Sequence, residues 1–233
     1  MRRFFTYLAW VALVAGLTGS ANAAGGSKKQ AAVATKTAAV NPADYVGSET
    51  CATCHADVAK KFGTSPHSKI SLMHKDAAGG CESCHGPGRA HVEGGGDVTK
   101  ILRISKASAK TVDATCLGCH AGTHPNFERS PHGKAGVSCT SCHSVHNPVA
   151  PVNLLKTSSQ TGLCFTCHSD VKPAFSQPFH HKVQEGLMQC SDCHDVHGSF
   201  REKNLKTTAD QNAVCTKCHA ETRGPFGYEH PVV

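Results

Sequence analysis

The sequence offers few residues for a conventional hydrophobic core. Its 233 residues include one Trp, three Tyr and nine Phe, and the single Trp10 lies in the N-terminal segment. No cysteine is left for a separate role, because all 14 belong to one repeated motif, C-x-x-C-H. This excludes a further disulfide, a free thiol or a separate thiolate metal site outside the motifs. A chain of this length therefore needs other material to fill its interior.

The motif C-x-x-C-H occurs seven times, and it is the attachment signature of c-type haem. Two thiols bond to two vinyl groups of one porphyrin, and the next residue turns its imidazole onto the iron. Seven covalently bound haem c groups would supply the missing core, and we expect the apoprotein to be largely unfolded. The cysteines that would bind the cofactor are Cys51, Cys54, Cys81, Cys84, Cys116, Cys119, Cys139, Cys142, Cys164, Cys167, Cys190, Cys193, Cys215 and Cys218, and the motif histidines that would bind iron are His55, His85, His120, His143, His168, His194 and His219.

Other uses of paired cysteines fit less well. Zinc knuckles need four ligands, so seven pairs make an odd number, and zinc does not require a His directly after every second Cys. Thioredoxin-like redox motifs do not occur seven times without a βαβ pattern. Haem is the favoured interpretation, with zinc and disulfides as the alternatives.

The positive net charge has a simple explanation if haem is bound. The formal charge is +7, and removal of residues 1–23 would delete Arg2 and Arg3 and leave +5. That balance alone would suit a nucleic-acid partner. Seven haems, each with two ionised propionates, would bring the chain to about −2 when oxidised and about −9 when reduced. Many Lys residues then have propionate partners, which argues against nucleic acid.

The N-terminal segment predicts export. Residues 1–23 have the layout of a Sec-type signal peptide, with Arg2 and Arg3 before an apolar stretch and a small-residue cleavage site at Ala23. The alternative is an uncleaved anchor, but the apolar run is short for a transmembrane helix. Residues 24–44 are small, polar and lysine-bearing, and are expected to form a disordered tail. Residues 45–233 are the predicted heptahaem domain.

A two-haem repeat governs this domain, with units at about 45–112, 113–160, 161–211 and 212–233. In each unit a Phe follows the first motif His by seven residues, and a further His follows that Phe. In the first three units a second motif comes next, trailed by another His. These positions give seven candidate second ligands for seven irons: His67, His91, His132, His146, His180, His197 and His230. The match predicts that every iron is bound by two histidines.

Geometry limits which haem each candidate can serve. A trailing histidine lies only a few residues after its motif, as His146 does after His143, and cannot reach the far face of its own haem. The trailing histidines are therefore expected to bind a neighbouring iron and to hold consecutive haems close. The histidine after the Phe could serve its own haem or another, and this choice stays open. The trailing set is His91, His146 and His197.

Other residues compete for the second position. His181 rivals His180, and counting from Phe175 with Lys182 fixed favours His180. A methionine could also act as an axial ligand. Residues outside the repeat register, and so not expected to bind iron, are Met73, Met188, His74 and His124.

Short helices are predicted to carry many of the motifs, because Ser48 and Asp113 stand where N-caps are favoured. Pro66, Pro131 and Pro178 interrupt them. Residues 92–112 hold no motif and are predicted to form a loop with a short extended piece at 101–104. The predicted fold is mostly irregular with short α-helices, an elongated haem array of a multihaem c-type cytochrome built from two-haem repeats.

From Val46 onward the chain resembles the periplasmic decahaem cytochromes of the MtrA/DmsE family, as a shorter, seven-haem version. The segments that carry the resemblance are VGSETCATCH, CESCHGPGRAH, HHKVQEGLMQCSDCHDVHGSF and CTKCHAETRGPFGYEHPVV. The resemblance implies a periplasmic haem wire associated with an outer-membrane β-barrel porin. It would take electrons from a periplasmic or inner-membrane donor cytochrome and pass them to an outer-surface cytochrome or reductase.

Three alternatives to a wire remain. The first is a soluble periplasmic electron shuttle. The second is a reductase of nitrite, hydroxylamine or a sulfur oxyanion, which would need an open iron position. The ligand count leaves no iron open and no C-x-x-C-K variant occurs, so no enzyme activity is expected. The third is a cytochrome filament.

Overall fold

The computed structural model describes residues 41–70, 79–150, 152–206, 210–225 and 227, which belong to one compact unit. The predicted signal peptide and residues 24–40 of the predicted tail lie outside this range. Residues 42–44 form a 3-10 turn, η1 (Pro42–Asp44), capped by Asn41. Arg89 donates a hydrogen bond to the carbonyl of Ala43. The structured part therefore includes residues that the sequence assigned to the tail.

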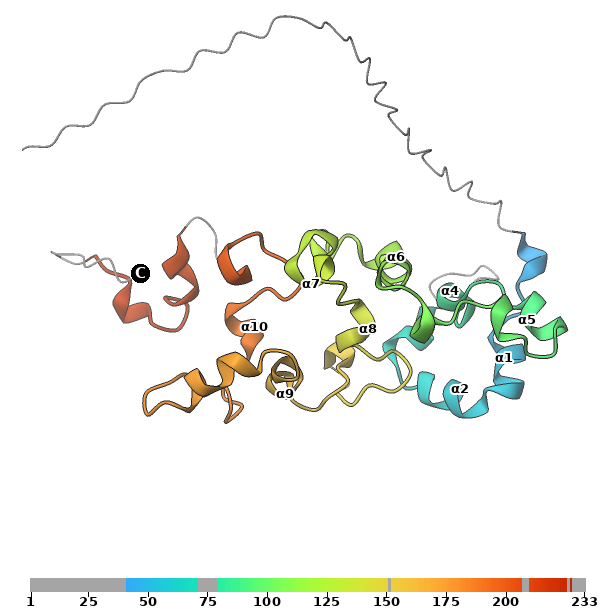
Figure 1. Ribbon diagram of the computed structural model, residues 1–233, viewed down its shortest axis with the longest axis horizontal. Helices are drawn as coiled ribbons and strands as arrows, with labels where there is room; N and C mark the ends of the chain where they lie inside the picture. The colour runs from blue at the N-terminus through green and yellow to red at the C-terminus, as the bar shows by residue number, and fades with distance from the viewer. Residues whose placement is uncertain (1–40, 71–78, 151, 207–209, 226, 228–233) are drawn as a thin grey trace, which may run out of the picture. The chain divides into compact units, whose positions relative to one another are not determined.

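Helices in the described part are short and separated by irregular chain (Figure 1). The only β pairing there consists of isolated bridges that join Leu155 to His143 and Ala150, and Leu205 to His194. None of these helices is long and apolar enough to span a membrane. The predicted class, mostly irregular with short α-helices, is confirmed. The α-helices are α1 (Ser48–Cys54), α2 (Ala56–Phe62), α4 (Glu82–His85), α5 (Arg89–Glu93), α6 (Ala109–His120), α7 (Pro131–Lys134), α8 (Cys139–Cys142), α9 (Gln160–Phe165) and α10 (Cys190–Cys193); the remaining 3-10 turns are η2 (Pro66–Lys69), η3 (Val98–Lys100), η4 (Ile104–Lys106), η5 (Phe127–Arg129), η6 (Val152–Leu154), η7 (Ser169–Ser176), η8 (Glu202–Asn204), η9 (Gln211–Val214) and η10 (Ala220–Thr222).

Two details of the helix prediction were wrong. Ser48 is the first residue of α1, whose N-cap is Gly47. Helix α6 begins at Ala109, inside the stretch predicted to be a loop, and its cap is the side chain of Ser108, which accepts a hydrogen bond from Thr111 N. Ser48 and Asp113 are therefore not N-caps, because each helix begins earlier in the chain than predicted.

The turns that carry His67 and His132 share the sequence Ser-Pro-His. The buried Ser65 hydroxyl accepts a hydrogen bond from His67 N at 3.3 Å, and the buried Ser130 hydroxyl accepts one from Gly133 N at 3.1 Å. Proline follows each serine at the first helical position, where its missing N–H costs nothing. Each cap therefore places the histidine on the first turn of a short helix.

Few apolar side chains are buried in the described residues. They are Val112, Phe127, Leu154 and Val183, whereas Phe179 is 98% exposed and Leu187 is 79% exposed. Four buried side chains are far too few to offset the conformational entropy of so long a chain. The exposed apolar groups are available to cover bound cofactors.

Candidate haem-binding sites

Six of the seven motif histidines face a second histidine across a gap of nearly constant size. Two imidazoles on opposite sides of one metal are expected to have centroids roughly 6 Å apart, from a metal–nitrogen bond of about 2 Å on each side plus the distance from nitrogen to ring centre. The gaps fit a histidine pair that shares one iron. The pairs and their centroid distances are His55–His91 (6.3 Å), His85–His146 (5.8 Å), His120–His67 (5.9 Å), His143–His197 (6.2 Å), His168–His132 (6.0 Å) and His219–His181 (6.1 Å).

These pairs link the repeat units in two directions. The histidine after the Phe faces forward, to the first motif of the next unit, as His67 faces His120. The trailing histidine of the second and third units faces back, to the second motif of the preceding unit, as His146 faces His85. In the first unit, the trailing His91 faces the first motif of its own unit. None of the six faces the motif that directly precedes it in sequence.

Backbone carbonyls fix the orientation of several rings. A carbonyl can only accept a hydrogen bond, so Nδ1 carries the proton and Nε2 keeps its lone pair. This arrangement is typical of histidines that bind metal through Nε2. The Nδ1 contacts run from His85 to Leu102 O (2.8 Å), His91 to Asp97 O (2.9 Å), His132 to Val196 O (3.0 Å), His143 to Asn153 O (2.6 Å) and His194 to Lys203 O (2.8 Å).

The carbonyls that hold His143 and His194 come from two equivalent return loops. Asn153 and Leu154 have positive φ in the second unit, and Lys203 and Asn204 have it in the third. These left-handed residues turn the chain back so that it pairs with the motif it has just left. Sequence reasoning missed both loops, although the repeated segments NLLK (153–156) and NLK (204–206) were a usable signal.

Ser48 and Asp113, which do not act as caps, anchor the second motif of their own unit. Ser48 Oγ accepts a hydrogen bond from Cys81 N at 3.2 Å. Asp113 Oδ1 accepts one from Cys139 N at 2.9 Å and another from Cys139 Sγ at 3.2 Å. Both residues lie three positions before the first motif cysteine, which is the spacing that could have revealed them.

A buried carboxylate holds the first unit together. Glu82 is 3% exposed and lies inside the second motif. Its oxygens accept hydrogen bonds from Gly47 N at 2.9 Å and Gly88 N at 2.7 Å, and from Val46 N at 3.1 Å. These three N–H groups compensate the cost of burying the charge. Sequence reasoning gave this residue no role.

The thiols of each motif interact electrostatically with a thiol of the next motif along the chain, and in three of these six pairs the two thiols are also hydrogen-bonded. A hydrogen bond from Cys139 lowers the pKa of the Cys116 thiol to about 7. Burial, followed by the nearby Cys81, raises the pKa of Cys51 to about 11. The neighbouring thiols that join successive motifs are Cys51 and Cys81, Cys84 and Cys116, Cys116 and Cys139, Cys142 and Cys167, Cys164 and Cys190, and Cys193 and Cys215.

Burial keeps candidate second ligands uncharged. It is the main cause that lowers the pKa of His197 to about 4, followed by nearby His124 and His143. Burial also lowers the pKa of His67 and His146. Only the neutral imidazole binds a metal, so these surroundings favour ligation.

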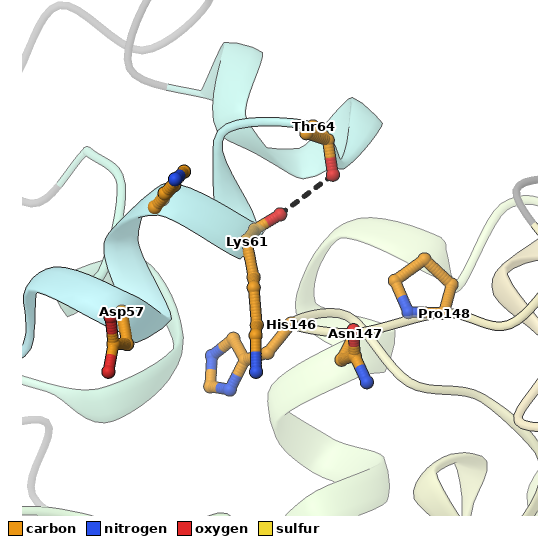
Figure 2. A pocket seen from close by; sticks show the side chains of 7 residues that line it. Asp57, Lys61, Thr64, His146, Asn147 and Pro148 are labelled. Atoms are coloured by element: carbon orange, nitrogen blue, oxygen red, sulfur yellow. Dashed lines mark hydrogen bonds between the residues drawn. The ribbon is translucent and has the colours of Figure 1, made fainter.

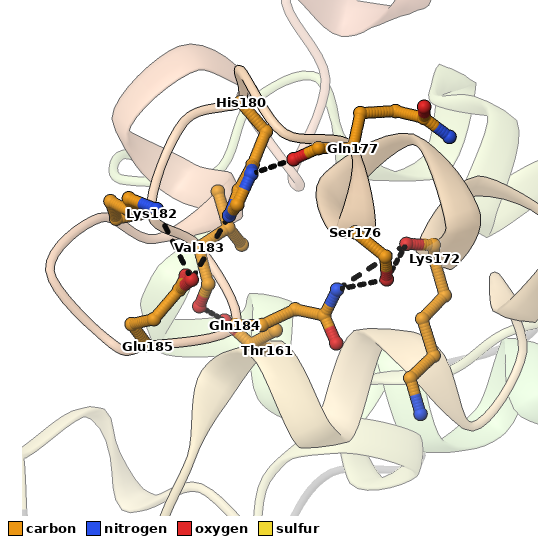
Figure 3. Close-up of polar contacts among 9 residues, drawn as sticks. All are labelled: Thr161, Lys172, Ser176, Gln177, His180, Lys182, Val183, Gln184 and Glu185. Atoms are coloured by element: carbon orange, nitrogen blue, oxygen red, sulfur yellow. Dashed lines mark hydrogen bonds and ion pairs between the residues drawn. The ribbon is translucent and has the colours of Figure 1, made fainter.

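The structure places His181, and not the favoured His180, opposite a motif histidine. Both nitrogens of His180 are engaged, Nδ1 with the carbonyl of Gln177 and Nε2 with Glu185 Oε1 at 2.9 Å (Figure 3). The register argument favoured His180, and this unit differs from the first two because it has no Ser-Pro-His turn. Residues 177–181 are not helical, so counting from the Phe does not predict which way each ring turns.

His124 was not expected to bind iron, and it packs against candidate ligands. Its centroid is 4.0 Å from that of His197 and 6.2 Å from that of His120. The second gap resembles that of a ligand pair. However, His124 N donates to His120 O at 2.9 Å within one continuous turn, so both rings leave the same short stretch of chain, while His67 approaches His120 from another unit.

Three of the residues weighed as iron ligands lie outside the described part of the chain: Met73, His74 and His230. His230 is the predicted seventh second ligand. Among the described residues, His194 is accordingly the one motif histidine that does not face a second ring.

A cavity of about 360 Å³ opens beside His146 (Figure 2). Lys60, Lys61 and Asp57 are among its lining residues. With two ammonium groups and one carboxylate, these three side chains give this part of the cavity a net positive charge. Lysines next to a candidate ligand suit the ionised propionates of a haem.

The donor set does not suit a bare metal ion. Within the described ranges, no group of three or more His, Cys, Asp or Glu side chains is arranged to hold one. A structural zinc site needs four protein ligands. A porphyrin brings four nitrogen donors of its own, so a histidine pair completes the coordination. The ring pairs therefore fit haem and not the zinc alternative.

Comparisons with known families agree with this conclusion. Residues 81–167 match the family "Cytochrome c-type protein NrfB-like", residues 180–224 the "Doubled CXXCH motif" and residues 18–86 "Cytochrome c554 and c-prime". The multiheme cytochrome MtrA of Shewanella baltica (strain OS185) is 33% identical over 192 residues, which cover 80% of this chain and 57% of MtrA. The chain is an MtrA-like multihaem c-type cytochrome. It carries multiple covalent haem c groups on its C-x-x-C-H motifs.

A more distant similarity extends to a larger protein. The C-type polyheme cytochrome OmcB of Geobacter sulfurreducens, in strains DL-1 / KN400 and ATCC 51573 / DSM 12127 / PCA, is 27% identical over 203 residues. The match covers 75% of this cytochrome and 25% of OmcB. This cytochrome thus spans little more than half of MtrA and a quarter of OmcB.

Proposed function

We propose that this cytochrome is an electron carrier in which seven covalent haems form one continuous path, each iron bound by two histidines. The observation that carries the proposal is the set of six histidine pairs with centroids 5.8–6.3 Å apart. The seventh pair is His194 with His230, the candidate left by the count of seven motifs and seven second ligands.

Continuity of the path is supported by the contacts between motifs. Neighbouring thiols join every motif to the next one, from Cys51 and Cys81 to Cys193 and Cys215. The histidine pairs add links that skip one motif, as between His132 and His168. No motif stands apart from the others, so an electron that enters at one motif has a neighbour at each step.

A reductase is the second candidate, and one observation favours it. Catalysis at haem iron needs an open axial position. His194 is the motif histidine without a partner ring in the described residues, so its iron is where such a position would lie. Six motif histidines face a second histidine and only His194 does not, within the described residues, so the electron carrier is favoured over the reductase.

We further propose that the protein is exported by the Sec route and works in the periplasm beside the outer membrane. It would take electrons from a periplasmic or inner-membrane cytochrome and pass them, through a β-barrel porin, to an outer-surface cytochrome or reductase. The similarity to MtrA supports this placement. The alternative is a soluble periplasmic shuttle that does not enter a porin.

Two measurements test the carrier. The intact mass of the exported protein is expected to show seven haems, and free thiols or a lower mass would contradict that count. Electron paramagnetic resonance of the oxidised protein is expected to show low-spin iron throughout. A high-spin signal equal to one haem, removed from the wild type by added nitrite or hydroxylamine, would favour the reductase.

Location needs a separate test. Membrane fractionation followed by co-purification is expected to recover a β-barrel protein with this cytochrome. Recovery as a free periplasmic monomer, with electron export unchanged in a deletion strain, would eliminate the conduit and leave the shuttle.

A further inference from the structure

The loop at 177–188 holds two adjacent histidines, His180 and His181, in different surroundings. Figure 3 shows the contacts of His180. His181 faces the motif histidine His219, with ring centroids 6.1 Å apart. His180 instead donates from both nitrogens to oxygens that can only accept, the carbonyl of Gln177 and Glu185 Oε1, which is 2.9 Å from Nε2. A ring whose Nε2 is bound to a carboxylate cannot offer that nitrogen to iron.

We propose that Glu185 is a positioning residue that decides which of these two histidines binds iron. It holds His180 away from the haem at Cys215/Cys218/His219 and leaves that position to His181. This inference rests on the ligand pairs of the proposed function. It assigns a role to a carboxylate that the repeat pattern does not include.

The loop fixes Glu185 in place. Lys182 Nζ lies 3.6 Å from the same Oε1 atom. Thr161 donates a hydrogen bond to the carbonyl of the buried Val183 at 3.2 Å. Gln184 Nε2 donates to Ser176 Oγ at 2.9 Å. These contacts anchor the residues just before Glu185, and just after it Leu187 N donates a hydrogen bond to Lys182 O at 3.0 Å. The carboxylate therefore meets His180 without a large further loss of conformational freedom.

Adjacent histidines of this kind compete for one iron. Both imidazoles have the same intrinsic affinity for metal, so the local surroundings decide between them. The contact with Glu185 makes the Nε2 atom of His180 less available to iron. When both His181 and this contact are removed, His180 should therefore become a substitute ligand.

The experiment compares three variants of the full-length, haem-loaded protein by electron paramagnetic resonance. His181→Ala is expected to convert one haem to high spin. His181→Ala with Glu185→Ala is expected to lose at least half of that high-spin signal, because the released His180 takes the iron. His181→Ala with Glu185→Gln is expected to keep it, because the amide oxygen still accepts a hydrogen bond from His180.

A matched control removes a carboxylate that touches no histidine. Glu93 is exposed and pairs with Arg89 at 3.3 Å. His181→Ala with Glu93→Ala is expected to remain as high-spin as His181→Ala alone. The intact mass must show the same haem count in each variant. If alanine at position 181 lowers that count, His181→Gln is used in place of His181→Ala.

Failure of this inference is distinguishable from failure of the ligand assignment. Low-spin iron throughout in both His181→Ala and His181→Gln would overturn the assignment of His181 as an iron ligand. One high-spin haem that persists equally in the Glu185→Ala double variant would overturn the role of Glu185 and leave that assignment intact. Equal recovery in the Glu185→Ala and Glu185→Gln backgrounds would also overturn it.

Discussion

His67 and His132 occupy the same position in successive repeat units and differ in one contact. Both follow a capped Ser-Pro, and both face the first motif of the next unit, with centroids 5.9 and 6.0 Å from His120 and His168. His132 Nδ1 donates to Val196 O at 3.0 Å. His67 Nδ1 is buried and has no hydrogen-bond partner among the described residues. The repeat thus sets where the ring lies, while contacts from elsewhere set its hydrogen bond.

Val196 reaches His132 because residues 195–198 pack against the turn that carries it. Asn126 Nδ2 donates to Gly198 O at 3.2 Å. Gly198 has a φ of +108°, and an added Cβ would lie 2.9 Å from Ser130 Cβ. This close approach needs glycine, and the trailing histidine of the second unit is followed by Asn147 instead.

The largest expected effect comes from removing either ring. His67→Ala and His132→Ala should each convert one haem to high spin, because each takes away one of two axial ligands. Electron paramagnetic resonance measures the high-spin fraction. His124→Ala is the control and should leave all irons low-spin; high-spin iron in that variant and not in His67→Ala would reverse the assignment at His120.

A smaller effect should follow from closing the gap at Gly198. Gly198→Ala is expected to destabilise the haem-loaded protein by roughly 1 to 3 kcal/mol, from backbone strain and the clash with Ser130. Chemical denaturation monitored by haem absorbance gives the change. Gly122→Ala is the matched control, because nothing lies within 4 Å of its added Cβ. Equal effects at the two glycines would show that the close approach is unimportant.

The shared caps should have similar but unequal contributions. Ser65→Ala and Ser130→Ala each remove an N-cap worth about 0.5 to 2 kcal/mol. The larger loss is expected at Ser130, which is fully buried and has the shorter hydrogen bond. The same denaturation measurement ranks them, and a neutral Ser130→Ala would rule out the cap as a source of stability there.

The smallest effect concerns reduction potential. A carbonyl bonded to Nδ1 makes an imidazole a stronger donor and favours ferric iron. The haem at His168, bound through His132, should therefore have a lower potential than the haem at His120, bound through His67. A redox titration followed by electron paramagnetic resonance orders the two, with the His67→Ala and His132→Ala variants identifying their signals. The opposite order would mean that burial outweighs the hydrogen bond.

Sequence reasoning predicted features that depend on neighbouring residues. The seven motifs, the two-haem repeat and the short helices all follow from local spacing. The Ser-Pro-His turns explain why His67 and His132 lie where the register placed them. Where this turn is missing, at Gln177-Pro178, the same register favours His180, whereas the ring that lies opposite His219 is that of His181.

Features that depend on distant contacts could not be read from spacing. Whether His67 faces its own motif or the next one is decided by how the units pack. The same is true of the carbonyl of Val196, which comes from 64 residues further along the chain. The anchor at Asp113 holds a cysteine 26 residues away, and only the repetition of its spacing hinted at it.

The two directions of linkage have a consequence for a broken chain. With the histidine pairs bound as proposed, a protease that cuts within residues 152–158 leaves two bridges across the break. One runs forward from His132 to the haem of His168, and the other runs back from His197 to the haem of His143. The two fragments then stay joined without a peptide bond or a disulfide, and they separate only when the irons lose their histidines. The metal bonds make this cytochrome tolerant of nicks that would divide an ordinary repeat protein.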